Sequence, residues 1–124
     1  MTRDEAMRIL AESRVEIDSI DQRLVDLLNQ RTRIVEEIGR AKQAAGLPIY
    51  EPKREDEVFR NIVAHNTGPL TTDALQRIYE RLIDEMRSLQ HMRLAGNAPL
   101  PEPRPVASSV EGRSKLSVDG RGKP

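Results

Sequence analysis

The sequence predicts an all-α protein in which a very long first helix pairs with a second copy of the chain. Three observations support this fold class. Apolar residues recur at helical spacing from about Asp4 to Ala45, with Gly39 as the only helix-weakening residue between them. At 1.5 Å per residue this helix would be about 60 Å long, more than the rest of one small chain can cover. No strand-like alternation occurs in residues 1–94. We therefore expect three helices in an intertwined antiparallel homodimer.

The first helix is predicted from its apolar stripe. The stripe contains Leu10, Ile17, Ile20, Leu24, Leu27, Leu28, Ile34, Val35, Ile38 and Ala41. Gly46 and Pro48 interrupt it, so the helix should end near Ala45.

Two shorter helices should follow. Pro52 suits the first turn of a second helix, with Glu51 just before it. The segment 65–69 contains a glycine and a proline and should end that helix. A third helix should begin near Thr71 or Thr72, either of which can cap it. Its apolar positions are Leu75, Ile78, Tyr79, Leu82, Ile83, Met86 and Leu89.

The composition changes after Leu94. Residues 95–124 hold five of the eight prolines and four of the seven glycines. We therefore expect one helical domain over residues 1–94 and a disordered Pro/Gly-rich tail over 95–124.

Composition and charge exclude several classes of function. The 20 basic and 20 acidic residues cancel, which argues against a nucleic-acid or membrane-surface binder. Cysteine is absent, and His65 and His91 lie far apart without a ligand spacing, so we expect exposed helix-end histidines and no metal site. No signal peptide or membrane span is apparent, and we expect a cytoplasmic protein.

Three charged residues fall within the apolar stripe of the first helix: Arg14, Arg31 and Lys42. Each alone could lie at the edge of the stripe and extend its charge into water. Arg31 and Lys42, however, are three helical turns apart, about 16 Å along the axis, and share one face. Val35 and Ile38 lie between them as an apolar floor, so the two long side chains can close on a compact anion.

Arg14 cannot reach that place within one chain, because it is about 25 Å from Arg31 along the axis. An antiparallel pair of helices related by a two-fold axis near Val25 would place Arg14 of the partner opposite residue 36, between Arg31 and Lys42. The prediction is two equivalent sites per dimer, each built from both chains.

The other two helices offer further polar candidates. Gln90 continues the series Ile83, Met86, Leu89 and is either a buried amide that needs hydrogen-bond partners or a partly exposed residue near a helix end. Glu55 lies in the first turn of the second helix, where an acidic residue is favourable in any case, and so is weak support for a site by itself.

The chain resembles the helical chorismate mutases. The resemblance rests on the pattern R-x-x-I-D-x-I-D-x-x-L followed by six residues and R, then I-G-R-A-K and P-K-R-E, within residues 10–94. It implies a dimer of three-helix chains with exchanged long helices, converting chorismate to prephenate in aromatic amino acid biosynthesis. It implies no cofactor.

The resemblance also implies roles for individual residues. The partner's Arg14 and this chain's Arg31 would each hold a substrate carboxylate, and Lys42 and Gln90 would donate to the ether oxygen. Glu55 and the backbone around Glu51 would bind the ring hydroxyl. Further substrate contacts would come from Arg54, Ile38, Val58, Ile83 and Met86. Many relatives have serine at position 86 and aspartate at position 51, so these two positions depart from the pattern.

Two alternatives remain at this point. An isochorismate pyruvate lyase shares the fold and the arginine, lysine and glutamine framework, although Glu55 favours a substrate with a ring hydroxyl placed as in chorismate. A non-enzymatic helical dimerisation or regulatory module fits the long helix equally well, but it does not explain the charges in the stripe.

Overall fold

The computed structural model describes residues 1–96, which form three helices and no strand. They are α1 (Arg3–Ala45), α2 (Pro52–His65) and α3 (Thr72–Leu94). The all-α prediction is confirmed, and the helix bounds agree with the sequence to within a residue or two. Residues 97–124, which make up nearly all of the predicted tail (95–124), lie outside the described residues.

The ends of α1 are fixed by local hydrogen bonds. The backbone N–H of Glu5 donates to the Thr2 hydroxyl (3.1 Å), and the backbone N–H of Thr2 donates to the Glu5 carboxylate (2.7 Å). This reciprocal arrangement is a capping box, which the residues T-x-x-E allow. Gly46 ends the helix in the left-handed region (φ 69°), a conformation that glycine adopts without strain.

The connection between α2 and α3 is held by side-chain bonds to the backbone. The Asn66 side chain donates to the Leu70 carbonyl (2.9 Å) and accepts from the Gly68 N–H (3.0 Å). The Thr71 hydroxyl then caps α3 by accepting from the Ala74 N–H (3.1 Å). Of the two threonines proposed from the sequence, Thr71 is therefore the cap.

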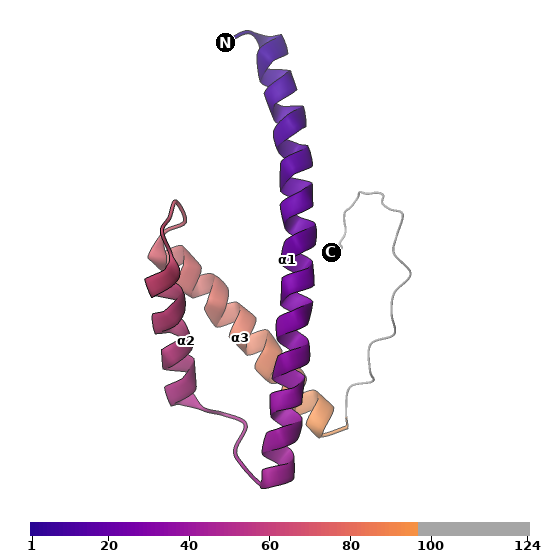
Figure 1. The fold of residues 1–124 in the computed structure, drawn as a ribbon, viewed down its shortest axis with the longest axis vertical. Helices are drawn as coiled ribbons and strands as arrows, with labels where there is room; N and C mark the ends of the chain where they lie inside the picture. The colour runs from indigo at the N-terminus through magenta and orange to yellow at the C-terminus, as the bar shows by residue number, and fades with distance from the viewer. Residues whose placement is uncertain (97–124) are drawn as a thin grey trace.

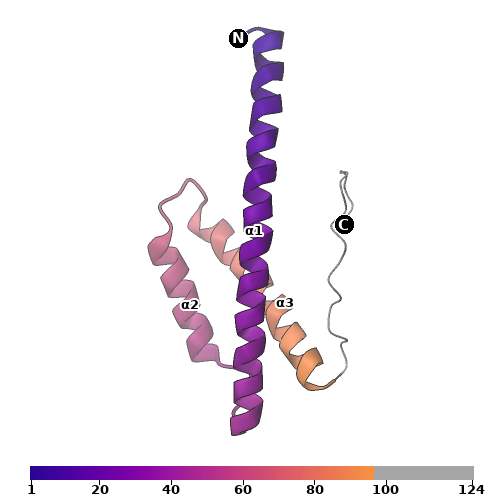
Figure 2. The same ribbon diagram turned by 45° about the vertical axis from the view of Figure 1, so that its right-hand side comes forward.

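Helix α3 is the element that joins the other two. It crosses the C-terminal half of α1 and also packs against α2 (Figure 1). Both views show the N-terminal half of α1 projecting beyond the other helices (Figure 2). Within residues 1–96 the buried positions are Gly39, Met86 and Gln90, all where α1 meets α3. No helix in this described range has the length and apolar character needed to cross a bilayer.

The apolar stripe of α1 is largely uncovered in the single chain. Leu10, Ile17, Ile20, Leu24 and Leu27 are each between 45% and 58% exposed. Such a long row of exposed aliphatic side chains is unusual for a chain that acts alone.

Candidate active site

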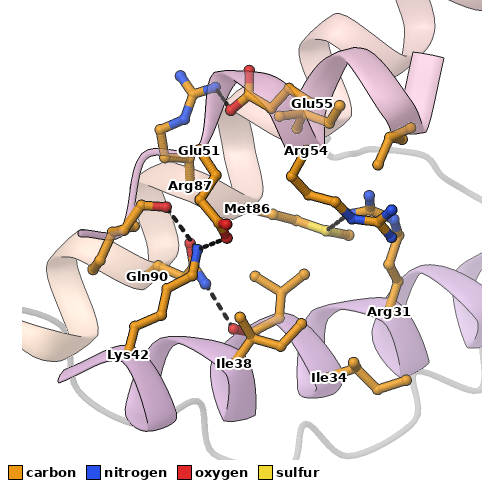
Figure 3. A pocket seen from close by; sticks show the side chains of 14 residues that line it. Arg31, Ile34, Ile38, Lys42, Glu51, Arg54, Glu55, Met86, Arg87 and Gln90 are labelled. Atoms are coloured by element: carbon orange, nitrogen blue, oxygen red, sulfur yellow. Dashed lines mark hydrogen bonds and ion pairs between the residues drawn. The ribbon is translucent and has the colours of Figure 1, made fainter. Parts of the chain in front are cut away.

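A pocket of about 410 Å³ lies between the three helices. The C-terminal half of α1 forms one wall, the start of α2 and the loop before it form a second, and the middle of α3 forms the third (Figure 3). Ten of the eleven side chains expected to contact a substrate line it together, and so does Val35 of the expected apolar floor. The ten are Arg31, Ile38, Lys42, Glu51, Arg54, Glu55, Val58, Ile83, Met86 and Gln90. Residues distant in sequence therefore converge on one place.

Lys42 occupies one end of the pocket. Its ammonium group lies 2.6 Å from a Glu51 carboxylate oxygen and donates to the Ile49 carbonyl (2.8 Å). The Lys42 side chain is only 13% exposed, so these contacts fix a charge that is largely removed from water. An ammonium group has three N–H donors, and two such contacts leave one donor for a ligand.

Gln90 is buried beside Lys42 (Figure 3). Its side-chain Nε2 donates to the Val35 carbonyl (2.7 Å) on the facing helix. Because the amide nitrogen carries two hydrogens, this bond leaves the second N–H of Nε2 without a protein partner among residues 1–96. The interpretation of Gln90 as a buried amide with partners is confirmed, and the exposed alternative is wrong.

Gly39 makes this position of Gln90 possible. A Cβ built on Gly39 would lie 3.3 Å from Gln90 Nε2 and 3.4 Å from its Cγ, closer than most van der Waals contacts. The absence of a side chain at Gly39 therefore lets α3 place its amide directly against α1.

Two arginines lie at the other end of the pocket (Figure 3). Arg31 donates through Nη1 to the Met86 sulfur (2.9 Å), and Arg54 pairs with the exposed Glu57 (3.1 Å). Among residues 1–96 no carboxylate forms an ion pair with Arg31. Its charge is therefore available to an anion entering the pocket.

Arg87 is a pocket residue that the sequence reasoning missed. It pairs with Glu55 across the gap between α3 and α2, and its guanidinium lies over the Tyr50 ring, 5.1 Å from the centroid. A signal was available, because Ile83, Arg87 and Gln90 follow one another at helical spacing on one face of α3. Ile34 and Ile49 also line the pocket and were not proposed as site residues.

Arg14 is the one candidate outside the pocket. It is exposed in the projecting half of α1, about 25 Å along the helix axis from Arg31. The single chain therefore does not bring it to the site, as expected. His65 and His91 are exposed near the C-terminal ends of α2 and α3, also as expected.

The charges of the pocket define the kind of ligand it can hold. Four cationic side chains, Arg31, Lys42, Arg54 and Arg87, line it with two carboxylates, Glu51 and Glu55. Lys42 pairs with Glu51 and Arg87 with Glu55, so the excess of two positive charges among the lining residues lies on Arg31 and Arg54. This excess suits a small dianion, and the floor of aliphatic side chains suits an apolar ring. Fold and site together define an all-helical protein with a cationic pocket of a size and charge that suit a small anionic molecule.

Comparison with known proteins identifies the family. The model of the family "Chorismate mutase type II" matches residues 13–91, well over half of the chain. The chain belongs to this family. It is 40% identical over 88 residues to a bifunctional chorismate mutase/prephenate dehydratase of Aquifex aeolicus, a match that covers 68% of this chain. The match spans only 24% of that relative's length.

Two solved structures share the fold over nearly their whole length. A chorismate mutase from Thermus thermophilus is 34% identical, with a TM-score of 0.65, over 68% of this chain and 94% of that one. A chorismate mutase from Helicobacter pylori in complex with prephenate is 33% identical, with a TM-score of 0.66, over 71% and 96%.

Proposed function

We propose that this protein is a chorismate mutase that rearranges chorismate to prephenate in its three-helix pocket. The observation that carries the proposal is the placement of two nitrogen donors, on Lys42 and Gln90, at one end of a pocket whose other end holds Arg31 and Arg54. Membership of the chorismate mutase type II family and the likeness to the prephenate complex support it.

The proposed chemistry requires positioning and charge stabilisation. The reaction breaks an ether C–O bond and forms a C–C bond within one molecule, so no proton or group is transferred to the protein. Binding both carboxylates selects the compact conformer in which the reacting carbons are close. Arg31 holds one of them, and Arg54 adds positive charge beside it.

Lys42 and Gln90 act on the breaking bond. Negative charge grows on the ether oxygen as the bond stretches, and donors already aimed there stabilise the transition state more than the ground state. The remaining N–H of each side chain serves this purpose, while Glu51, Ile49 and Val35 hold the other donors in place. Ile38, Val58, Ile83 and Met86 then shape the apolar part of the pocket.

The ring hydroxyl is assigned to the second helix. Glu55 lies at the start of α2 and lines the pocket. It accepts a hydrogen bond from the ring hydroxyl, and the backbone near Glu51 makes a second contact with that hydroxyl. This assignment favours chorismate over isochorismate. Turnover of isochorismate to salicylate and pyruvate, with chorismate unchanged, would instead establish the lyase alternative.

We also propose that the active form is an antiparallel homodimer in which the partner's Arg14 completes each pocket. The exposed aliphatic stripe of α1 supports a second copy as its cover, and the two-fold pairing near Val25 brings Arg14 beside Arg31 and Lys42 of the other chain. A helical dimerisation module without activity would bury the same stripe, but it would not need these three charges.

A mixing experiment tests the shared site. Arg14→Ala and Lys42→Ala variants should each be nearly inactive, yet after co-refolding half of the dimers contain one pocket with both residues intact. Activity should return to roughly a quarter of the wild-type value, by the symmetry of a two-site dimer. No recovery in a mixture shown to contain heterodimers would exclude a site built from both chains.

The direct test of the function is the purified protein with chorismate. Loss of chorismate absorbance with stoichiometric formation of prephenate is expected, and no prephenate from a folded protein would overturn the proposal. Four expectations remain predictions. They are a cytoplasmic location, the lack of a cofactor or metal, the lack of a nucleic-acid or membrane partner, and a boundary between the helical domain and the tail at residue 94.

A further inference from the structure

Arg87 connects three parts of the pocket wall. It comes from α3, pairs with Glu55 on α2, and lies over Tyr50 in the loop between α1 and α2. Its side chain is 29% exposed and that of Glu55 is 25% exposed, so the ion pair is mostly shielded from water. Asp84, one turn earlier on α3, also lies within 3.4 Å of the Arg87 guanidinium.

This geometry restricts where the Glu55 carboxylate can point. A guanidinium stacked on an aromatic ring has little freedom to rotate, and its planar N–H groups fix the direction of a carboxylate bound to it. Glu55 uses Oε2 for Arg87, and its Oε1 accepts no hydrogen bond from the protein within residues 1–96. Oε1 is thus free of protein donors in this part of the chain, and the pairing of Oε2 with Arg87 determines where it points.

We propose that Arg87 is a positioning residue that holds Glu55 ready to accept the ring hydroxyl of the substrate, and so sets the preference for a hydroxylated ring. The proposal rests on the function proposed above, in which Glu55 receives that hydroxyl. It adds a residue on α3 that acts through Glu55.

The proposal predicts a particular kinetic signature. The ring hydroxyl is not at the breaking or the forming bond, so its hydrogen bond is made equally in the ground state and the transition state. Losing such an interaction raises KM and leaves kcat nearly unchanged. A donor to the reacting ether oxygen, such as Lys42, should show the opposite pattern and lower kcat.

The experiment compares Arg87→Met with wild type on two substrates. Methionine keeps much of the apolar stem but cannot pair with Glu55. On chorismate we expect KM to rise about tenfold, the scale of a weakened hydrogen bond to a charged group, with kcat within about threefold of wild type. On a chorismate analogue without the ring hydroxyl, the two proteins should have KM values within about threefold of each other, because the contact that Arg87 supports is absent.

Two further variants separate positioning from general structure. Arg87→Lys, which can still pair with Glu55, should recover most of the wild-type KM. In a Glu55→Gln background, Arg87→Met should have little additional effect, because the two residues act through one contact. Arg81→Met is the matched control: it removes an arginine from the exposed Arg81–Glu85 pair of the same helix and should leave both constants unchanged.

The outcomes are distinguishable. An equal rise in KM on both substrates would mean that Arg87 contacts the substrate directly or maintains the pocket as a whole, and would overturn the proposal. So would an unchanged KM on chorismate, or a selective loss of kcat. If the folded wild-type protein forms no prephenate, both the proposed function and this inference are wrong. If the wild type is active and Arg87→Met has the same KM on chorismate, only this inference is wrong.

Discussion

Replacing Lys42 by alanine should abolish most of the catalysis while leaving the protein folded. Three features of the structure support this expectation. The ammonium group lies beside Gln90 at one end of the pocket (Figure 3), its side chain is 13% exposed, and its position is fixed by Glu51 and the Ile49 carbonyl. It is therefore a donor oriented in advance toward a charge that develops only during the reaction.

The size of the effect follows from that role. Losing one such donor costs about 3 kcal/mol of transition-state stabilisation, which is roughly a hundredfold or more in kcat. The effect on folding should be smaller, because Glu51 is 49% exposed and can be hydrated once its partner is removed. A partly exposed ion pair contributes on the order of 1 kcal/mol or less.

The assay is the initial rate of chorismate consumption over a range of substrate concentrations. Far-ultraviolet circular dichroism and sedimentation would establish that the variant keeps its helices and its association state. Lys53→Ala is the matched control, because Lys53 is exposed in the first turn of α2 and does not line the pocket. A folded Lys42→Ala enzyme with kcat within about threefold of wild type would refute the assigned role.

Two other predictions follow from local contacts. Gly39→Ala should displace the Gln90 amide by a few tenths of an ångström, because the new Cβ would lie too close to it. We expect kcat to fall about tenfold with little loss of helix content, since a small misplacement of a catalytic group slows the reaction. Equal kinetic constants in both proteins would show that Gln90 tolerates the shift. The pKa of the Glu5 carboxyl should lie below its ordinary value. The main cause is the hydrogen bond from the Thr2 backbone N–H, and the hydrogen bond with the Thr2 hydroxyl is the smaller one. Because this pKa is lower in the folded state than in the unfolded state, the cap contributes its full stabilisation of α1 at pH values above the unfolded-state pKa. That stabilisation is lost as the pH falls through the folded-state pKa. A carbon-detected NMR titration of Glu5 would show this, and an ordinary titration midpoint would contradict it.

The helices themselves could be predicted from the sequence because their signals are local. An apolar residue every three or four positions defines one face of a helix, whatever packs against it. Gly46, Pro52 and Thr71 act on the backbone within a few residues of themselves, so the ends of the helices were also predictable. The capping box at Thr2 was equally readable, although it was not proposed.

Part of the pocket could be predicted for the same reason. Arg31, Ile38 and Lys42 share one face of one helix, and the helical repeat alone places them together. A polar residue in an apolar stripe marks a place where burial needs a partner or a ligand, and this signal also found Gln90 on α3.

The partners of these residues were decided by the tertiary structure. Arg87 meets Glu55 across 32 positions of sequence, and Gln90 meets Val35 across 55. Such contacts depend on the angle at which α3 crosses α1 and on the path of the loop through Tyr50, and neither is encoded in the periodicity of a single helix. The sequence by itself determined which faces carry charge, because that requires only the geometry of one helix. Which charges pair, and which remain available to a ligand, required the three helices to be placed against one another.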